Sequence, residues 1–223
     1  QAEVPCRVEV LPESATSSEV TGLLARLSAD PAVQGILLQE PVPEPLVAEE
    51  LVLAIDPAKD IDGVHPLNAG RLFQGRDEGL VPATALGGME LLRRAGIELR
   101  GREALVIGRS TIVGRPFALL LLHAHATVTI AHSRTVDLAA QARRADLLAV
   151  AVGRAGFVTA DMVKPGAVVV DFGINYVDGA LCGDVEPAVA EVAGALTPVP
   201  GGTGSMTTAA LLANLIAAAE ATR

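Results

Sequence analysis

A short apolar run that ends in a glycine turn is the stretch of this sequence best suited to hold a charged ligand. Residues Ala104 to Ile107 are too few for a helix, Gly108 ends the run, and Ser110 can cap a helix that follows. Free backbone N–H groups and the positive end of the dipole at such a helix start favour an anion such as a dinucleotide pyrophosphate. The spacing departs from G-x-G-x-x-G because Arg109 and Ser110 stand where the middle glycine is expected, so plain architecture is the alternative.

Polar side chains also gather in the loop from Asp56 to Pro66, which reads D-P-A-K-D-I-D-G-V-H-P. Prolines and a glycine so close together keep the segment irregular and leave its side chains free to point at a ligand. A solvated acidic turn is the alternative. Gln39 is a further candidate because it follows an apolar strand expected at 35–38, and α/β sheets place ligands at the carboxyl ends of their strands.

The segment His132-Ser133-Arg134-Thr135 follows the second strand of the expected nucleotide-binding unit. An NAD-binding protein has an acidic residue here for the ribose 2′-hydroxyl. A hydroxyl and an arginine suit a 2′-phosphate instead, with Arg109 as a second positive charge, so NADP is the predicted cofactor. A polar turn with an incidental arginine is the alternative. Ile174, after a later strand, would offer a backbone amide and an apolar wall to the same crevice.

The elements that must position these residues alternate between strand and helix. Strands are expected at 7–11, 35–38, 104–107, 126–131, 147–152, 167–171 and 195–197. Helices are expected after a capping box at Thr16 to Glu19, at 46–55, 86–95, 112–123 and 138–144, and after Thr207. Such alternation predicts an α/β protein with a parallel sheet and right-handed crossovers.

Composition limits the classes of partner. The formal net charge of −9 argues against nucleic acid or an anionic membrane surface, and no apolar run reaches the length of a membrane span. With no visible signal peptide, we expect a soluble cytoplasmic protein. Cys6 and Cys182 are too few for a disulfide framework, and His123 and His125 lie away from the expected site, so no metal is predicted.

Eight motifs in order resemble one family across essentially the whole chain. They are Gln39-x-Pro-x-Pro43, Lys59-Asp-Ile-Asp62-Gly63, His65-Pro-x-Asn68-x-Gly70-Arg-Leu72, Gly108-Arg-Ser-x-Ile-Val-Gly114, His132-Ser133-x-Thr135, Asp171-x-Gly-Ile-Asn175, Gly183-Asp-Val185 and Thr197-Pro-Val-Pro-Gly-Gly202. The chain resembles the methylenetetrahydrofolate dehydrogenase/cyclohydrolase family.

This resemblance implies two α/β domains that flank a cleft. The folate domain would comprise residues 1–95, completed by a final helix at 200–223, and a Rossmann-type NADP domain would comprise 96–199. The activity implied is oxidation of methylenetetrahydrofolate to the methenyl form with NADP, followed by hydrolysis to formyltetrahydrofolate. The family's enzymes are generally homodimers.

Site residues follow from the same motifs. Asp62 would hold the pterin through its paired acceptors, which also favours a functional role for the acidic loop. Gln39 would assist the catalytic centre, and the turn of Pro200, Gly201 and Gly202 would approach the folate. The expected NADP contacts are Gly108, Arg109, Ser110, Ser133, Ile174 and Thr207.

The chain departs from the family pattern at the catalytic lysine. The resemblance places that lysine in a Tyr-x-x-x-Lys helix just upstream of the segment that begins at Gln1, and we expect residues before Gln1 to supply it. Glu40, Ala85, Thr203 and Ser205 also replace the usual residues. Without a positioned lysine the cyclohydrolase step would lose about 100- to 10,000-fold, whereas hydride transfer depends more on positioning. A family member that binds NADP or folate without turnover is the alternative.

Overall fold

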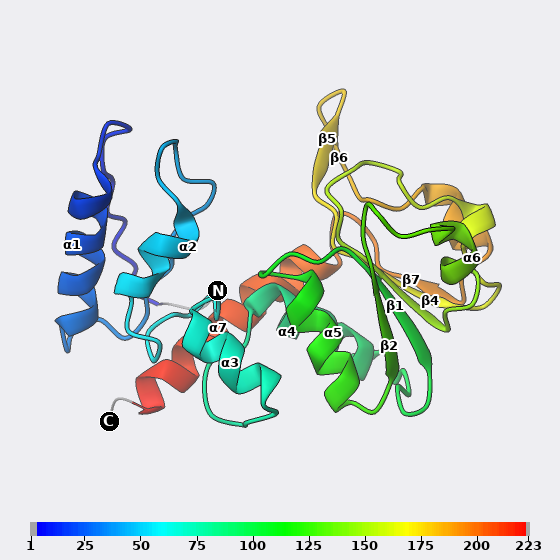
Figure 1. Ribbon diagram of the computed structural model, residues 1–223, viewed down its shortest axis with the longest axis horizontal. Helices are drawn as coiled ribbons and strands as arrows, with labels where there is room; N and C mark the ends of the chain where they lie inside the picture. The colour runs from blue at the N-terminus through cyan, green and yellow to red at the C-terminus, as the bar shows by residue number, and fades with distance from the viewer. Residues whose placement is uncertain (1–3, 222–223) are drawn as a thin grey trace.

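The structure, a computed structural model, describes residues 4–221 and has two lobes (Figure 1). Its α-helices are α1 (Ser17–Ala29), α2 (Ala48–Leu51), α3 (Pro66–Phe73), α4 (Ala83–Arg94), α5 (Gly114–His123), α6 (Leu138–Ala142) and α7 (Thr203–Ala221). Its 3-10 helices are η1 (Val52–Ala54), η2 (Ala160–Met162) and η3 (Pro187–Glu191). Its strands are β1 (Glu103–Ile107), β2 (Thr127–Ala131), β3 (Leu147–Val150), β4 (Val168–Asp171), β5 (Asn175–Val177), β6 (Ala180–Cys182) and β7 (Ala195–Leu196).

The second lobe is a parallel sheet in the order β2-β1-β3-β4-β7, which confirms the predicted fold class. Alternate residues of its strands enter two separate cores. Val106 packs with α4 and α5 on one face, and Leu105 packs with α6 and η3 on the other. Because the strands are covered on both faces, they are continuous apolar runs. The chain leaves β1 towards β2 on one side and returns to β3 on the other, so the carboxyl ends of β1 and β3 form the switch point where such sheets bind ligands.

The first lobe contains α1, α2 and η1 around a smaller apolar core that includes Val20, Leu24 and Leu51, and α3 lies against α5. The predicted capping box is confirmed, because the Thr16 hydroxyl accepts from the N–H of Glu19 and the Glu19 carboxylate accepts from the N–H of Thr16. The helix expected at 46–55 is split into α2 and η1.

Two strands expected in the first lobe are absent from the described residues. Residues 7–11 form no strand and are exposed, and 35–38 contributes only a single bridge between Ile36 and Asp60. Alternation of apolar residues indicates a face but does not supply the neighbouring strand that a ladder requires. These two strand predictions were therefore wrong for this structure.

Two elements were not foreseen. Helix α3 begins directly after the acidic loop, with Pro66 in its first turn and the His65 side chain accepting from the N–H of Leu67. A hairpin of β5 and β6 turns at Asp178 and Gly179, both with positive φ, and projects from the second lobe (Figure 1). Helix α4, which was expected at 86–95, starts at Ala83.

Helix α7 lies against α4 between the two lobes (Figure 1). The approach is close because a Cβ on Gly87 would lie 2.8 Å from the backbone of Met206. Buried Asn214 donates from its amide to the carbonyls of Ile61 (2.8 Å) and Val81 (2.9 Å). The last helix is therefore bonded to the loop that carries Asp62. No helix among residues 4–221 is long and apolar enough to cross a membrane.

Candidate functional site

A cavity of about 380 Å³ lies where the two lobes meet. Its lining combines the acidic loop, α2 and α3 of the first lobe with the glycine turn and α5 of the second. The residues are Leu38, Glu40, Ala48, Glu49, Val52, Ile55, Asp60, Asp62, Gly63, Val64, Pro66, Ala69, Leu72, Phe73, Pro82, Thr111, Ile112, Arg115, Pro116 and Leu119. The structure thus places Asp62 and the turn after β1 at one cavity.

The two carboxylates of the acidic loop have different surroundings. Buried Asp60 accepts from the N–H groups of Gly63 (3.2 Å) and His65 (2.7 Å) and from the amide of Asn68 (3.2 Å). Asp62 is half-buried, and its carboxylate makes no hydrogen bond to any of the described residues. Asp60 therefore shapes the loop, while Asp62 keeps both oxygens for a ligand.

Burial, which is the largest cause, and the nearby charges of Asp60 and Glu40 together raise the pKa of the Asp62 carboxyl to about 6. Each of these causes disfavours the ionised form. A ligand that donates two hydrogen bonds to the Asp62 carboxylate would favour that form instead. The group is thus suited to a substrate with paired N–H donors.

The turn after β1 has the geometry of an anion site. Gly108 has φ 128°, and a Cβ there would lie 2.2 Å from the carbonyl oxygen of Ala151, so only glycine fits. The N–H groups of residues 109–112 donate to no other described residue. They are the donors that remain for a pyrophosphate.

The structure corrects the expectation that the N–H groups at the start of the helix itself are free. The Ser110 hydroxyl accepts from the N–H groups of Val113 (3.1 Å) and Gly114 (3.2 Å). The N-cap residue of α5 is Val113, which has no side-chain cap, so the prediction that Ser110 caps the helix is not confirmed, although the Ser110 hydroxyl occupies two donors at the helix start. An anion would therefore contact the N–H groups of the turn before α5 rather than those of the first residues of the helix.

Other NADP candidates lie at the same edge of the sheet. Arg109 follows β1 and Ser133 follows β2, and these two strands are paired in parallel with Ile107 opposite Ala131. Both side chains are exposed and make no hydrogen bond within the described residues, and Ile174, after β4, is 64% exposed. A glycine cradle, free N–H groups, two hydroxyl or guanidinium side chains and an apolar wall fit a dinucleotide with a 2′-phosphate.

Several predicted site residues, on the folate side and at Thr207 on the NADP side, do not line the cavity. The Gln39 amide donates to the carbonyl of Glu40 (2.8 Å), and only its neighbours Leu38 and Glu40 face the cavity. Pro200, Gly201 and Gly202 form the turn before α7 and lie outside the lining. Thr207 donates within α7 to the carbonyl of Thr203 (3.0 Å).

Neither lysine of the chain lines this cavity. Lys59 is buried and donates to the carbonyls of Ser28 and Asp30, both at 2.7 Å, near the end of α1. Lys164 pairs with Asp146 at 2.7 Å. The positive charge in the lining is that of Arg115, the second residue of α5, which the sequence analysis missed because nothing marks it locally.

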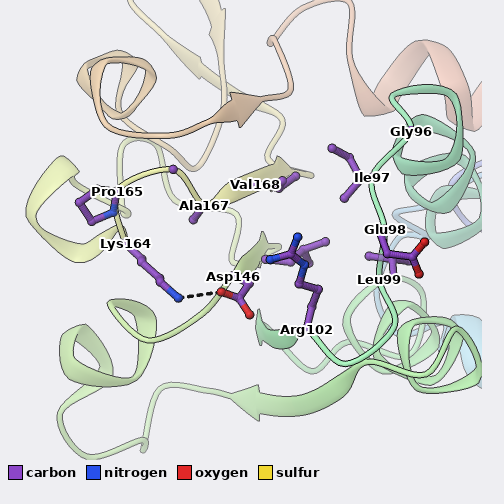
Figure 2. Close-up of a pocket in the computed structure, with 12 residues that line it drawn as sticks. Gly96, Ile97, Glu98, Leu99, Arg102, Asp146, Lys164, Pro165, Ala167 and Val168 are labelled. Atoms are coloured by element: carbon purple, nitrogen blue, oxygen red, sulfur yellow. Dashed lines mark hydrogen bonds and ion pairs between the residues drawn. The ribbon is translucent and has the colours of Figure 1, made fainter.

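A second cavity, of about 460 Å³, lies at the amino ends of the strands, around Arg102 and the Lys164–Asp146 pair (Figure 2). It contains none of the predicted site residues. Ligands of parallel α/β sheets bind at the carboxyl ends, so the smaller cavity is the better candidate despite its volume.

Comparisons with known proteins agree on one family. Residues 1–62 match the model of the tetrahydrofolate dehydrogenase/cyclohydrolase catalytic domain, and 82–223 match that of its NAD(P)-binding domain. The chain is 56% identical over 215 residues to the bifunctional protein FolD of Chloroflexus aurantiacus, and 53% identical over 213 residues to that of Thermus thermophilus. Each alignment covers 96% of this chain and 75% of the relative.

Solved structures are similar as well. The bifunctional FolD enzyme of Campylobacter jejuni has a TM-score of 0.92 at 44% identity, with 94% of this chain and 75% of that one covered. FolD of Trypanosoma brucei, solved in complex with NADP cofactor and an inhibitor, has a TM-score of 0.88 at 37% identity, with 95% and 75% covered.

Proposed function

We infer the function from the premise that this chain belongs to the tetrahydrofolate dehydrogenase/cyclohydrolase family. Its activity is the NADP-dependent oxidation of 5,10-methylenetetrahydrofolate to the 5,10-methenyl form and the hydrolysis of that form to 10-formyltetrahydrofolate. Bound NADP supplies the hydride acceptor. In the second step water adds to the methenyl carbon, one carbon–nitrogen bond of the bridge breaks, and a proton is released.

We propose that Asp62 binds the pterin. The observation that carries this proposal is a carboxylate at the cavity between the lobes that has no hydrogen-bond partner among residues 4–221. Its two oxygens match the amino and ring N–H groups of a pterin, and a bidentate pair fixes the orientation of the ring as well as its position. Orientation is what hydride transfer needs, because the reacting carbon must lie in line with the acceptor.

On the nucleotide side, we propose that Gly108, Arg109, Ser110, Ser133, Ile174 and Thr207 contact NADP. The free N–H groups of the turn support the pyrophosphate contact, and exposed Arg109 and Ser133 on neighbouring strands support the 2′-phosphate contact. Thr207 has the weakest support, because its hydroxyl bonds within α7.

We further propose that Gln39 and the turn from Pro200 to Gly202 contact the folate at the rim of the cavity. Gln39 adjoins two lining residues, and the turn leads directly into Thr203, whose hydroxyl donates to the carbonyl of Asp171 at the end of β4. We also propose the division into a folate domain of residues 1–95 with 200–223 and an NADP domain of 96–199. The hydrogen bond from the Asn214 amide to the carbonyl of Ile61 in the acidic loop supports the assignment of α7 to the folate side.

The proposed assembly is a cytoplasmic homodimer. Exposed Tyr176 and Val177 on the projecting hairpin support an apolar contact surface. Light scattering at several protein concentrations tests the assembly, and a monomer at all concentrations would contradict it.

The direct test of the activity is the appearance of methenyltetrahydrofolate absorbance from methylenetetrahydrofolate and NADP. We expect turnover by the folded protein. A folded preparation that binds NADP without turnover would support the non-catalytic alternative instead.

A further inference from the structure

The proposed function gives no role to the motif Gly183-Asp184-Val185. Asp184 is 0% exposed, yet its carboxylate pairs with no lysine or arginine of the described chain. Four donors surround it instead. They are the N–H groups of Val152 (2.6 Å), Gly153 (2.9 Å) and Arg154 (2.8 Å) and the side-chain amide of Asn175 (2.9 Å).

These donors come from two separate loops at the carboxyl edge of the sheet. Residues 152–154 follow β3, and Asn175 directly follows Ile174 after β4. The packing is tight, because a Cβ on Gly173 would lie 2.2 Å from the backbone nitrogen of Asp184. The Asp184 carboxylate therefore fixes the distance between the loop after β3 and the loop after β4.

A second buried carboxylate holds Asp184 in place. Asp171, at the end of β4, accepts from the N–H groups of Gly173 (2.8 Å), Asp184 (3.0 Å) and Val185 (3.0 Å). Charge-assisted hydrogen bonds of this kind are stronger than neutral ones and define geometry closely. The backbone at 184 is consequently as well anchored as its side chain.

The loop after β3 also touches the anion turn. Ala151 donates from its N–H to the carbonyl of Ile107 (2.8 Å), and its own carbonyl lies where a side chain on Gly108 would be. Any shift of residues 152–154 would therefore change one wall of the turn that we assign to the pyrophosphate.

We propose that Asp184 is a positioning residue for NADP: it holds the loops after β3 and β4 at the separation that lets the turn at Gly108 and the wall at Ile174 contact one dinucleotide. This inference rests on the proposed NADP site. Asp184 itself does not contact NADP and acts through the backbone of 152–154 and through Asn175.

Swapping the residue types at positions 184 and 175 by mutation distinguishes this positioning role from a general effect on stability. In Asp184→Asn a side-chain NH2 group replaces the carboxylate oxygen that accepts from the N–H of Arg154 and the amide of Asn175. Hydrogen-bond donors then face each other at this position. Asn175→Asp places two carboxylates together. The double variant restores one amide–carboxylate pair and leaves a single mismatch at the N–H of Arg154.

The experiment measures the dissociation constant of NADP by calorimetry for the full chain and each variant, with a thermal melt to establish folding. We expect Asp184→Asn to raise the constant by about 10- to 100-fold, because a buried donor is left unpaired. The double variant should recover part of that loss. Asp146→Asn, at the opposite edge of the same sheet, is the matched control and should bind within about twofold of the unaltered chain, since its ion pair lies outside the NADP site.

Folded Asp184→Asn that binds NADP as the unaltered chain does would overturn the proposal, as would a double variant that recovers no affinity. Should Asp184→Asn fail to fold, Asn175→Ala decides: weaker binding supports the role, and unchanged binding overturns it. An unaltered chain that binds NADP but shows no turnover contradicts the proposed activity and leaves the positioning result to be judged on the binding constants alone.

Discussion

Two aspartates that stand two positions apart in the acidic loop differ in what they are able to do. Asp60 accepts from two N–H groups of its own loop and from the amide of Asn68 in α3, whereas Asp62 has no such donor and faces a cavity that Glu40 also lines. Desolvation without compensating donors raises the pKa of Asp62 to about 6. Ligand binding by Asp62 therefore competes with protonation close to neutral pH.

We expect Asp62→Asn to raise the KM for methylenetetrahydrofolate by about 10- to 100-fold, because one charge-assisted acceptor is lost. In the unaltered protein kcat/KM should rise with pH through about 6, as the carboxylate forms. Steady-state rates across pH test both statements. A pH profile that is the same in Asp62→Asn would contradict the role of this carboxyl.

The same substitution should stabilise the protein at neutral pH. The folded-state pKa of Asp62 is raised above 3.8, so the native state binds a proton that the unfolded state has released, and unfolding becomes easier as the pH rises to about 6. Because Asp62 is partly exposed, solvent screens part of this effect. Asp62→Asn should therefore add about 1 to 2 kcal/mol to the free energy of unfolding at about pH 8. The gain should vanish near about pH 3. Denaturant titrations at the two pH values measure it.

Glu40 offers a separate check on the electrostatics of the cavity. Its charge raises the pKa of Asp62, though less than burial does. We expect Glu40→Gln to move the inflection of kcat/KM to lower pH without abolishing turnover. Glu78→Gln, a change to an exposed side chain with no partner among the described residues, should leave the inflection where it is.

Among the elements, the turn between β1 and α5 depends on backbone geometry that side chains cannot replace. Gly108→Ala would combine a positive φ with an overlap against Ala151. We expect it to cost about 1 to 3 kcal/mol in free energy of unfolding and to weaken NADP binding. Gly70→Ala, in α3 with open space around its Cα, should instead stabilise by about 0.5 to 1 kcal/mol. Chemical denaturation of the two variants compares them.

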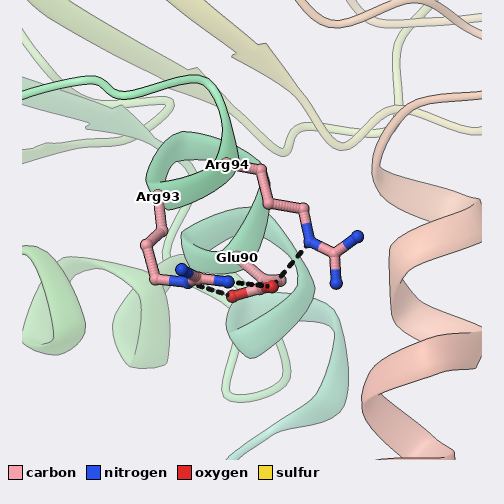
Figure 3. Close-up of polar contacts among 3 residues, drawn as sticks. All are labelled: Glu90, Arg93 and Arg94. Atoms are coloured by element: carbon pink, nitrogen blue, oxygen red, sulfur yellow. Dashed lines mark hydrogen bonds and ion pairs between the residues drawn. The ribbon is translucent and has the colours of Figure 1, made fainter.

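Helix α4 has a different support at its carboxyl end, where Glu90 bonds to both Arg93 and Arg94 (Figure 3). These bonds lower the pKa of Glu90 to about 2. The stabilisation is therefore present above the ordinary value of 4.5 and is lost as the pH falls towards 2. We expect Glu90→Gln to lower the Tm slightly at neutral pH, with a difference that shrinks in high salt because the pair is exposed. Thermal melts in low and high salt measure it.

At the scale of the whole molecule, one buried side chain bonds α7 to the segments on either side of α3 in the first lobe. Asn214 bonds to the carbonyls on either side of the α3 region, at Ile61 and Val81. Its loss leaves two buried acceptors unpaired and frees the residue next to Asp62. The position of the Asp62 carboxylate is thus coupled to a helix that is far away in sequence.

We expect Asn214→Ala to reduce the free energy of unfolding by about 2 to 4 kcal/mol and to lower kcat/KM for the folate while the NADP dissociation constant stays unchanged. Ile216→Ala, an exposed position on the same helix, is the control for the loss of a side chain. Weakened NADP binding in folded Asn214→Ala would show that α7 acts on both sites.

The sequence by itself determined the features that depend on neighbours along the chain. The cap at Thr16, the strand before Gly108 and the parallel sheet follow from spacing, turn chemistry and runs of buried residues, all of which act over a few positions. Eight ordered motifs added the family, although the roles of all the predicted site residues stay predictions.

Tertiary structure decided what depends on distant partners. A strand at 7–11 requires a neighbouring strand with which to pair. The pKa of Asp62 is raised by burial and by the charge of Glu40, which is 22 positions away in the numbering. Asp184 is given its four donors by segments up to 32 residues distant. A side chain's spacing indicates what chemistry it is capable of, but only packing decides whether its polar atoms are already bonded, because that depends on which segments the fold brings together.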